Sequence, residues 1–141
     1  MSKSTRRLAR EYALQTLYYT DTGKLSNDDS TMFVNSFYEN LDEETFAFCK
    51  DLLQGTLANQ KRIDKILSAK TKNWSVERMS VVDRSILRMA TYEIAFSGDK
   101  APVPAIIDEA IELAKKYSTE KSGKFINGLL DQIKAERNHG N

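Results

Sequence analysis

The chain has 141 residues, 40% of them hydrophobic and 29% charged, with a net charge of only +1. This length suits one domain with its own core, and no apolar run approaches the roughly 18 residues of a membrane span. The first residues lack the apolar stretch of a secretory signal, and one cysteine excludes an internal disulfide. We therefore expect a single cytoplasmic domain over residues 1–141, with a frayed tail from about residue 137.

The near-zero net charge hides an uneven distribution. Residues 1–19 carry a net charge of +3 and residues 20–60 a net charge of −6, whereas residues 61–100 carry +4 and the remainder is neutral. A polyanion responds to such local fields rather than to the average charge. The basic start of the chain is therefore a candidate binding surface.

The first predicted helix covers residues 4–19, STRRLAREYALQTLYY, in which an apolar stripe is formed by Leu8, Tyr12, Thr16 and Tyr19. Its first turns carry cations, although a helix dipole disfavours each of them there by about 0.3–1 kcal/mol. These cations are Lys3, Arg6, Arg7 and Arg10. Two interpretations stand equal: the cations follow the phosphates of a nucleic acid, or they are solvated in a frayed turn or paired with the acidic segment 28–44.

Helical periodicity continues through the chain, with no sustained strand-like alternation, so the sequence predicts an all-α protein. A second helix is predicted over residues 28–39. A third is predicted over residues 43–70, where Gly55 would allow another helix to approach closely. Its packing seam comprises Phe46, Cys49, Leu53, Thr56, Gln60, Ile63 and Leu67.

Ser80 and Asp83 form a capping-box pattern that predicts the start of the next helix. Its inward face is predicted to comprise Val82, Ile86, Met89 or Ala90, and Phe96. The segment GDKAPVP ends this helix, and a helix with a wide apolar face and an exposed Glu112–Lys116 pair follows. The last helix is predicted over residues 124–136, where Phe125 either joins the core or faces solvent.

Catalytic patterns are missing from the sequence. The only histidine, His139, lies near the end, and Cys49 occupies a seam position where burial makes a thiol inert. There is neither a metal-ligand cluster nor a Gly-rich phosphate loop, so no cofactor is expected. The carboxylates of Asp108, Glu109 and Glu112 are predicted to face solvent. We expect a binding protein, not an enzyme.

Three segments carry a family resemblance: RRLAREYALQTLY, NWSVERMSVVDRSILRMATYE and IIDEAIELAKKYSTEKSGKFINGLLDQI. In order and spacing they resemble the NusB family of bacterial transcription antitermination factors, leaving only residues 22–45 unmatched. The resemblance implies two packed helical bundles of about seven helices without enzymatic activity. It further implies binding of boxA-type single-stranded RNA together with the small-subunit ribosomal protein NusE, in the RNA polymerase antitermination complex that transcribes ribosomal RNA.

The resemblance also nominates residues. Arg6, Arg7 and Arg10, with Lys124, Phe125 and Asn127, are the implied RNA contacts, and Lys3, Tyr18 and Lys121 are added because they lie beside them. A helix starting just after Ser122 and Gly123 would offer backbone N–H groups to a phosphate, and Phe125 would stack on an unpaired base for about 1–3 kcal/mol. For the protein partner the family's docking area nominates Glu77 and Asp83, although capping alone would account for Asp83.

Two departures from the family pattern are Leu8, which interrupts the arginine run, and Asp108, where asparagine is usual. The alternative function is a protein-only helical adaptor, whose basic arm binds an acidic surface or a second copy in a homodimer. Similar domains are also attached to RNA methyltransferases, but these 141 residues contain no Rossmann-like half. RNA binding that depends on sequence would distinguish the first function from the adaptor.

Overall fold

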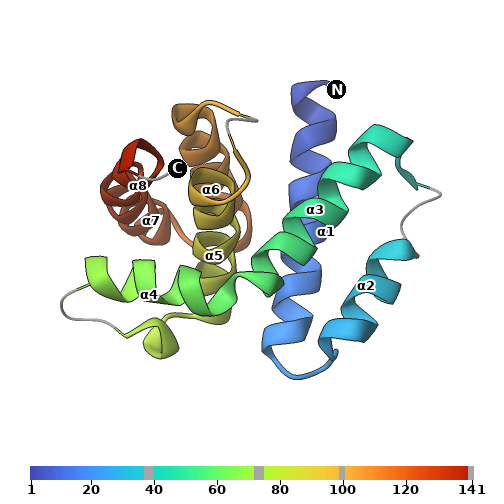
Figure 1. The fold of residues 1–141 in the computed structure, drawn as a ribbon, viewed down its shortest axis with the longest axis horizontal. Helices are drawn as coiled ribbons and strands as arrows, with labels where there is room; N and C mark the ends of the chain where they lie inside the picture. The colour runs from blue at the N-terminus through green and yellow to red at the C-terminus, as the bar shows by residue number, and fades with distance from the viewer. Residues whose placement is uncertain (37–39, 72–74, 99–100, 140–141) are drawn as a thin grey trace.

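The computed structural model describes residues 1–36, 40–71, 75–98 and 101–139, and all of their regular structure is helical (Figure 1). The predicted all-α class is therefore confirmed. The elements are α1 (Lys3–Asp21), α2 (Asn27–Asn35), α3 (Glu43–Ala58), α4 (Gln60–Lys70), the 3₁₀ helix η2 (Val76–Arg78), α5 (Val81–Ala95), α6 (Val103–Tyr117), α7 (Glu120–Ile133) and α8 (Ala135–His139). Within the described ranges, no helix has both the length and the apolar character needed to cross a bilayer.

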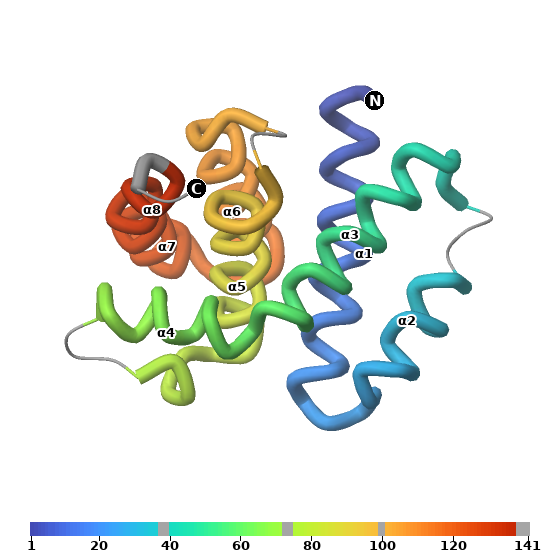
Figure 2. The backbone as a smooth tube through the Cα atoms, in the orientation of Figure 1, coloured from blue at the N-terminus to red at the C-terminus, as the bar shows by residue number. Residues whose placement is uncertain are grey.

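The helices form two groups that share α5. On one side α1, α2 and α3 pack against one another, and on the other α6 and α7 form a layer with α4 and α8 nearby (Figure 2). Helix α5 contacts α1 and α3 of the first group and α4, α6, α7 and α8 of the second. This arrangement confirms the two small bundles implied by the family resemblance.

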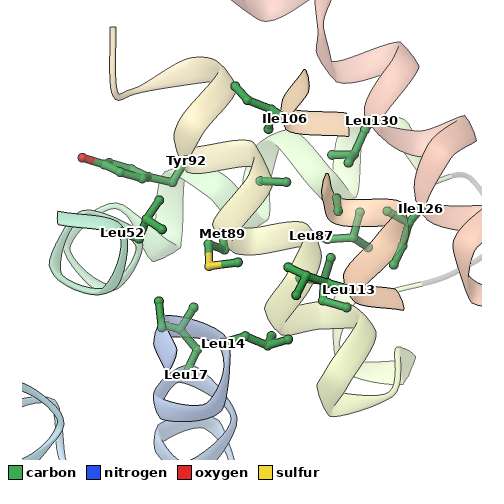
Figure 3. Packing of buried hydrophobic residues seen from close by; sticks show 14 of the residues in the cluster. Leu14, Leu17, Leu52, Leu87, Met89, Tyr92, Ile106, Leu113, Ile126 and Leu130 are labelled. Atoms are coloured by element: carbon green, nitrogen blue, oxygen red, sulfur yellow. The ribbon is translucent and has the colours of Figure 1, made fainter. Parts of the chain in front are cut away.

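The central position of α5 explains a burial pattern that periodicity did not predict. Every residue from 85 to 94 is buried, whereas the sequence predicted one inward face. Figure 3 shows Met89 directed towards Leu14 and Leu17 of α1, while Leu87 lies beside Leu113, Ile126 and Leu130 of the other group. A helix covered on both sides has no solvent face for polar residues, so Arg88 and Glu93 of α5 are also buried.

The buried face of α1 also differs from the predicted stripe. Ala9 and Ala13 are 0% exposed, and Leu14 and Leu17 join them, whereas Tyr19 is 37% exposed. Small side chains on the buried face let the neighbouring helices α3 and α5 approach α1 closely. The helix is not frayed at its start, because the Ser2 hydroxyl accepts the Thr5 N–H at 3.1 Å.

The predicted helix over residues 43–70 is two helices, with a turn at Asn59. The Asn59 side-chain amide donates to the Gly55 carbonyl at 2.8 Å, a local bond that ends α3. The seam itself crosses the break, because Cys49, Leu53, Ile63 and Leu67 are all 0% exposed. Cys49 is therefore a core residue, as predicted, and burial raises the pKa of its thiol to about 12.

The chain continues past α7 into a short helix, α8, which extends to His139. Arg137 donates to the carbonyls of Ile94 at 3.1 Å, Ala101 at 2.8 Å and Glu93 at 3.2 Å. These bonds satisfy carbonyls at the end of α5 and tie α8 to it. The last part of the predicted second helix, with Phe37, lies outside the described residues; α2 itself runs from Asn27 to Asn35.

Candidate nucleic-acid interface

The cations of α1 differ in their partners. Lys3 is exposed, and Arg6 is half-buried, with its guanidinium donating to the Met1 carbonyl at 2.9 Å. Neither side chain forms an ion pair with any described residue. Their charges are therefore free for an external anion.

Arg10 does not belong to this exposed set, and its predicted place on the basic binding surface at the start of the chain is wrong. It is 4% exposed and makes a bidentate pair with Glu93 of α5, with Nε at 2.9 Å and Nη2 at 2.8 Å from the two carboxylate oxygens. Its guanidinium also lies 5.2 Å from the centre of the Phe48 ring. Arg10 connects α1 to α5. It has no free surface for a polynucleotide, because Glu93 and Phe48 cover its guanidinium.

Arg7 is intermediate between these cases. Its Nε and Nη2 donate to Glu109 of α6 at 3.0 and 3.2 Å, and these bonds, with the charge of Glu109, raise the pKa of Arg7. The Glu109 side chain is only 8% exposed, so its predicted solvent-facing position is wrong, whereas 41% of the Arg7 side chain remains exposed. Glu109 thus holds the guanidinium in one orientation at the surface. The acidic partners of Arg7 and Arg10 lie outside segment 28–44.

The seam between α1 and α6 continues with a second charged contact that the sequence did not reveal. Glu11 accepts hydrogen bonds from Lys116 Nζ at 2.5 Å and from the Tyr117 hydroxyl. The predicted Glu112–Lys116 pair is absent, and Glu112 instead pairs with Lys115 at 3.8 Å. Burial acts to raise the pKa of Glu11, but the two hydrogen bonds and the Lys116 charge together lower it.

This depressed pKa makes stability sensitive to acid. A carboxylate with a folded-state pKa below its unfolded value stabilises the fold above the unfolded pKa, and this contribution is lost as the pH falls through the folded pKa. We expect the midpoint temperature of thermal unfolding to decrease as the pH is lowered below 4.5, the ordinary pKa of a glutamate. In Glu11→Gln this decrease should be less steep. Glu112→Gln, in an exposed pair, is the control. Parallel acid profiles of wild type and Glu11→Gln, from circular dichroism melts, would contradict the assignment.

Helix α7 starts four residues earlier than predicted, which changes how its residues face a ligand. Thr119 is the N-cap, and its hydroxyl accepts the Ser122 N–H at 2.9 Å. Ser122 and Gly123 therefore lie inside the helix, and the predicted anion site at their backbone N–H groups is wrong. The candidate side chains are nevertheless at the surface, since Phe125 is 37% exposed and the others are exposed as well: Lys121, Lys124 and Asn127.

A groove of about 350 Å³ lies between the start of α5 and the first turns of α7. The Ser122 hydroxyl donates to Asp83 Oδ2 at 2.8 Å and joins the two helices. Asp83 is also the acidic residue of the predicted capping box. The Ser80 hydroxyl accepts the Asp83 N–H at 3.1 Å, which confirms the predicted start of α5. The groove is lined by Arg78, Met79, Ser80, Asp83, Thr119, Lys121, Ser122 and Phe125.

Tyr18 lies in the adjoining hollow, and it is 37% exposed. The hollow is formed by α1, α5 and α6 through Leu14, Gln15, Tyr18, Tyr19, Val82 and Tyr117. Val82 and Asp83 are neighbours in α5, so the hollow and the groove adjoin. We call the surface from Lys3 along the α1–α6 seam to Tyr18 and Phe125 the α1–α7 strip.

Comparisons with known proteins identify the family of this chain. The NusB family model matches residues 7–135. The chain is 62% identical over 135 residues to the transcription antitermination protein NusB of Elusimicrobium minutum, covering 96% of each protein, and 41% identical to that of Bdellovibrio bacteriovorus, covering 94% of this chain and 97% of that one. The chain belongs to the NusB family.

Solved structures of NusB proteins have the same fold as this NusB-family chain. T. maritima NusB superposes with a TM-score of 0.84 at 38% identity, covering 93% of this chain and 91% of the other. A second structure, of the antitermination factors NusB and NusE in complex with double-stranded RNA, superposes with a TM-score of 0.81 at 27% identity over 95% and 98% of the two chains.

Of the sequence-predicted RNA contacts in this NusB-family chain, Tyr18 lines the hollow, and Lys121 and Phe125 line the groove. Arg6 instead lines a separate pocket with Glu44 and Phe48 of α3. Asn127 is exposed without lining the groove, and Glu77 is exposed on η2 beside it. Sequence reasoning missed Arg78, Lys116 and Tyr117. The only sequence signal for Arg78 was its place in the family motif NWSVERM. Lys116 and Tyr117 were missed because periodicity assigns the polar residues of their helix to solvent.

Proposed function

We propose that this chain is a transcription antitermination factor that binds boxA-type RNA together with ribosomal protein NusE. It would act in the RNA polymerase antitermination complex during ribosomal RNA synthesis, in the cytoplasm, as one domain over residues 1–141. It acts by binding and carries out no chemical step. The observation that carries this proposal is the α1–α7 strip, where unpaired cations adjoin an exposed phenylalanine in a chain of the NusB family.

We assign two kinds of RNA contact to this surface, ionic contacts to phosphates and stacking of aromatic rings on bases. Four surface cations form no ion pair with any described residue, and they are the proposed phosphate contacts: Lys3 and Arg6 at the start of α1, and Lys121 and Lys124 of α7. Neutralising about four phosphates of a single strand predicts that log K falls with log salt with a slope of about −3. Arg7 adds a guanidinium already oriented by Glu109, so less side-chain entropy is lost on binding.

Phe125 and Tyr18 are the proposed base contacts. Each of these residues is 37% exposed, so part of its ring is open to solvent while the rest of the side chain is packed. Stacking of a nucleobase on such a ring contributes about 1–3 kcal/mol. Asn127 lies farther along α7 and would reach only a strand that continues past Lys124. Single-stranded bases suit this surface because their faces are accessible.

We assign the partner surface for NusE to η2 and the start of α5. Glu77 is exposed there and can meet a basic partner directly. Asp83 is engaged with Ser122, so its proposed role is to keep the partner surface in a fixed position relative to the groove. The solved structure of NusB and NusE in complex with double-stranded RNA supports the binding of both a protein partner and RNA by a chain of this fold.

The test is a titration of boxA-like RNA, scrambled RNA and a duplex of the same sequence, with and without NusE, across a salt series. Phe125→Ala should weaken boxA-like single strands by about 1–3 kcal/mol and leave the duplex nearly unchanged. Lys121→Ala should weaken all three RNAs and reduce the salt slope by about 0.7. Met32→Ala and Lys65→Ala are matched controls, because both residues are exposed away from the strip.

The protein-only adaptor predicts the opposite pattern. Equal RNA affinities for wild type, Phe125→Ala and Lys121→Ala, with a salt slope near zero, would contradict RNA binding by the strip. NusE binding that survives nuclease treatment and is abolished by changes at Lys3 and Arg6 would instead assign the basic arm to a protein partner. A change of mass with concentration in light scattering would identify self-association.

A further inference from the structure

A cavity of about 410 Å³ lies away from the α1–α7 strip, where the junction of α3 and α4 faces the end of α1 and the start of α2. Its size is that of a small-molecule pocket. Leu17 and Leu57 supply apolar walls, Thr20 and Asn27 supply polar ones, and the first residues of α4 line one side. Figure 1 shows the junction next to the lower part of α5.

The start of α4 lacks the cap that helices normally have. Asn59 ends α3 and also precedes α4, and its side-chain amide is used on the Gly55 carbonyl of α3. No side chain therefore caps α4, whose first residues, Gln60, Lys61 and Arg62, line the cavity. Uncapped backbone N–H groups, together with the helix dipole, favour an anion.

A buried hydroxyl on the same wall is a second, independent observation. Ser85 is 1% exposed and lines the cavity, and its Oγ has no hydrogen-bond partner within the described part of the chain. A buried hydroxyl without a partner is costly, by about 1–3 kcal/mol, and calls for an acceptor. An oxygen of an anionic ligand would supply one.

The charges around the cavity also favour an anion. Lys61 is exposed and forms no ion pair with any described residue. The acid that lines the cavity, Asp21, is already compensated by Arg84 at 2.7 Å and Arg88 at 3.4 Å. Lys61 therefore gives this wall a positive charge that no described carboxylate pairs with.

We propose that this cavity binds a phosphate-bearing ligand of nucleotide size. The phosphate lies at the start of α4, near Lys61 and Ser85, and the rest of the ligand packs between Leu17 and Leu57. The same chemistry is present in a free nucleotide and in a nucleotide of an RNA chain. This site is separate from the α1–α7 strip and does not depend on the proposed function.

The test is an NMR titration of the full ¹⁵N-labelled chain with inorganic phosphate and with AMP, against sodium chloride at matched ionic strength. We expect saturable shifts of the Gln60 and Lys61 amides, with tighter binding of AMP because its ring reaches the apolar walls. Lys61→Ala should weaken phosphate binding by about three- to fivefold, the size of one exposed charge interaction. Lys65→Ala, one turn further along α4, should leave binding unchanged.

Ser85→Ala separates binding from folding. The hydroxyl makes no bond in the free protein, so its removal should leave the thermal midpoint unchanged or raised while phosphate affinity falls. Shifts identical to those with chloride, or equal affinities of wild type, Lys61→Ala and Ser85→Ala, would overturn the proposal. Weaker RNA binding by Lys61→Ala would identify RNA as the source of the phosphate, and unchanged RNA binding with tight AMP binding would identify a free nucleotide.

Discussion

Glu93→Ala is expected to lower the free energy of unfolding by about 3–5 kcal/mol, because it leaves the Arg10 guanidinium buried without its counter-ion. Both side chains are almost fully buried, at 4% and 5% exposure, and two hydrogen bonds of 2.8 and 2.9 Å join them. The cation cannot easily return to solvent, since Phe48 lies over it. Urea unfolding monitored by circular dichroism measures the loss.

A double variant tests whether the unpaired charge of Arg10 causes the loss of stability in Glu93→Ala. Arg10→Met with Glu93→Leu removes both charges and retains much of the volume, so we expect it to recover most of the lost stability. If Glu93→Ala lowers the free energy of unfolding by less than about 1 kcal/mol, Arg10 can reach solvent. An arginine that contacts RNA would have to reach solvent in this way. The double variant should also retain the salt dependence of RNA binding, because Arg10 is not among the proposed phosphate contacts.

Gly55→Ala is expected to destabilise the fold by about 1–3 kcal/mol, although alanine is the better helix former. A Cβ at Gly55 would lie 2.0 Å from the nearest ring atom of Tyr92, far inside van der Waals contact. The ring cannot swing away freely, because its hydroxyl donates to Asp51 at 2.8 Å and the residue is 6% exposed. Thermal and urea unfolding measure the effect.

The Tyr92 ring is the source of this cost, which a double-mutant cycle tests. Tyr92→Leu removes the overlapping ring atoms, so adding Gly55→Ala to it should cost less than in wild type, or even stabilise through helix propensity. Gly123→Ala is a matched control, since its Cβ would meet the nearest atom at an ordinary 3.6 Å. Additive effects of Gly55→Ala and Tyr92→Leu would contradict the close approach of α3 and α5.

Local signals in the sequence determined the helical class and several precise features. Ser80 and Asp83 predicted the start of α5, because a cap depends on residues three positions apart. Gly55 predicted a close helix approach because glycine has no side chain. Cys49 predicted a core thiol because periodicity places it on the predicted packing seam. The family resemblance rested on ordered motifs and predicted the two-bundle fold.

Only the tertiary structure decided which charges are free. Arg6, Arg7 and Arg10 look alike in the sequence, yet Arg7 and Arg10 have partners from distant helices, since Glu109 and Glu93 lie more than 80 positions away. Arg6 has no such partner among the described residues. Helix α7 also starts earlier than predicted, because Thr119 provides its N-cap. Helix periodicity and capping are local and can be read along the chain, whereas the burial of a charge depends on which distant helix covers it and whether that helix brings a counter-ion.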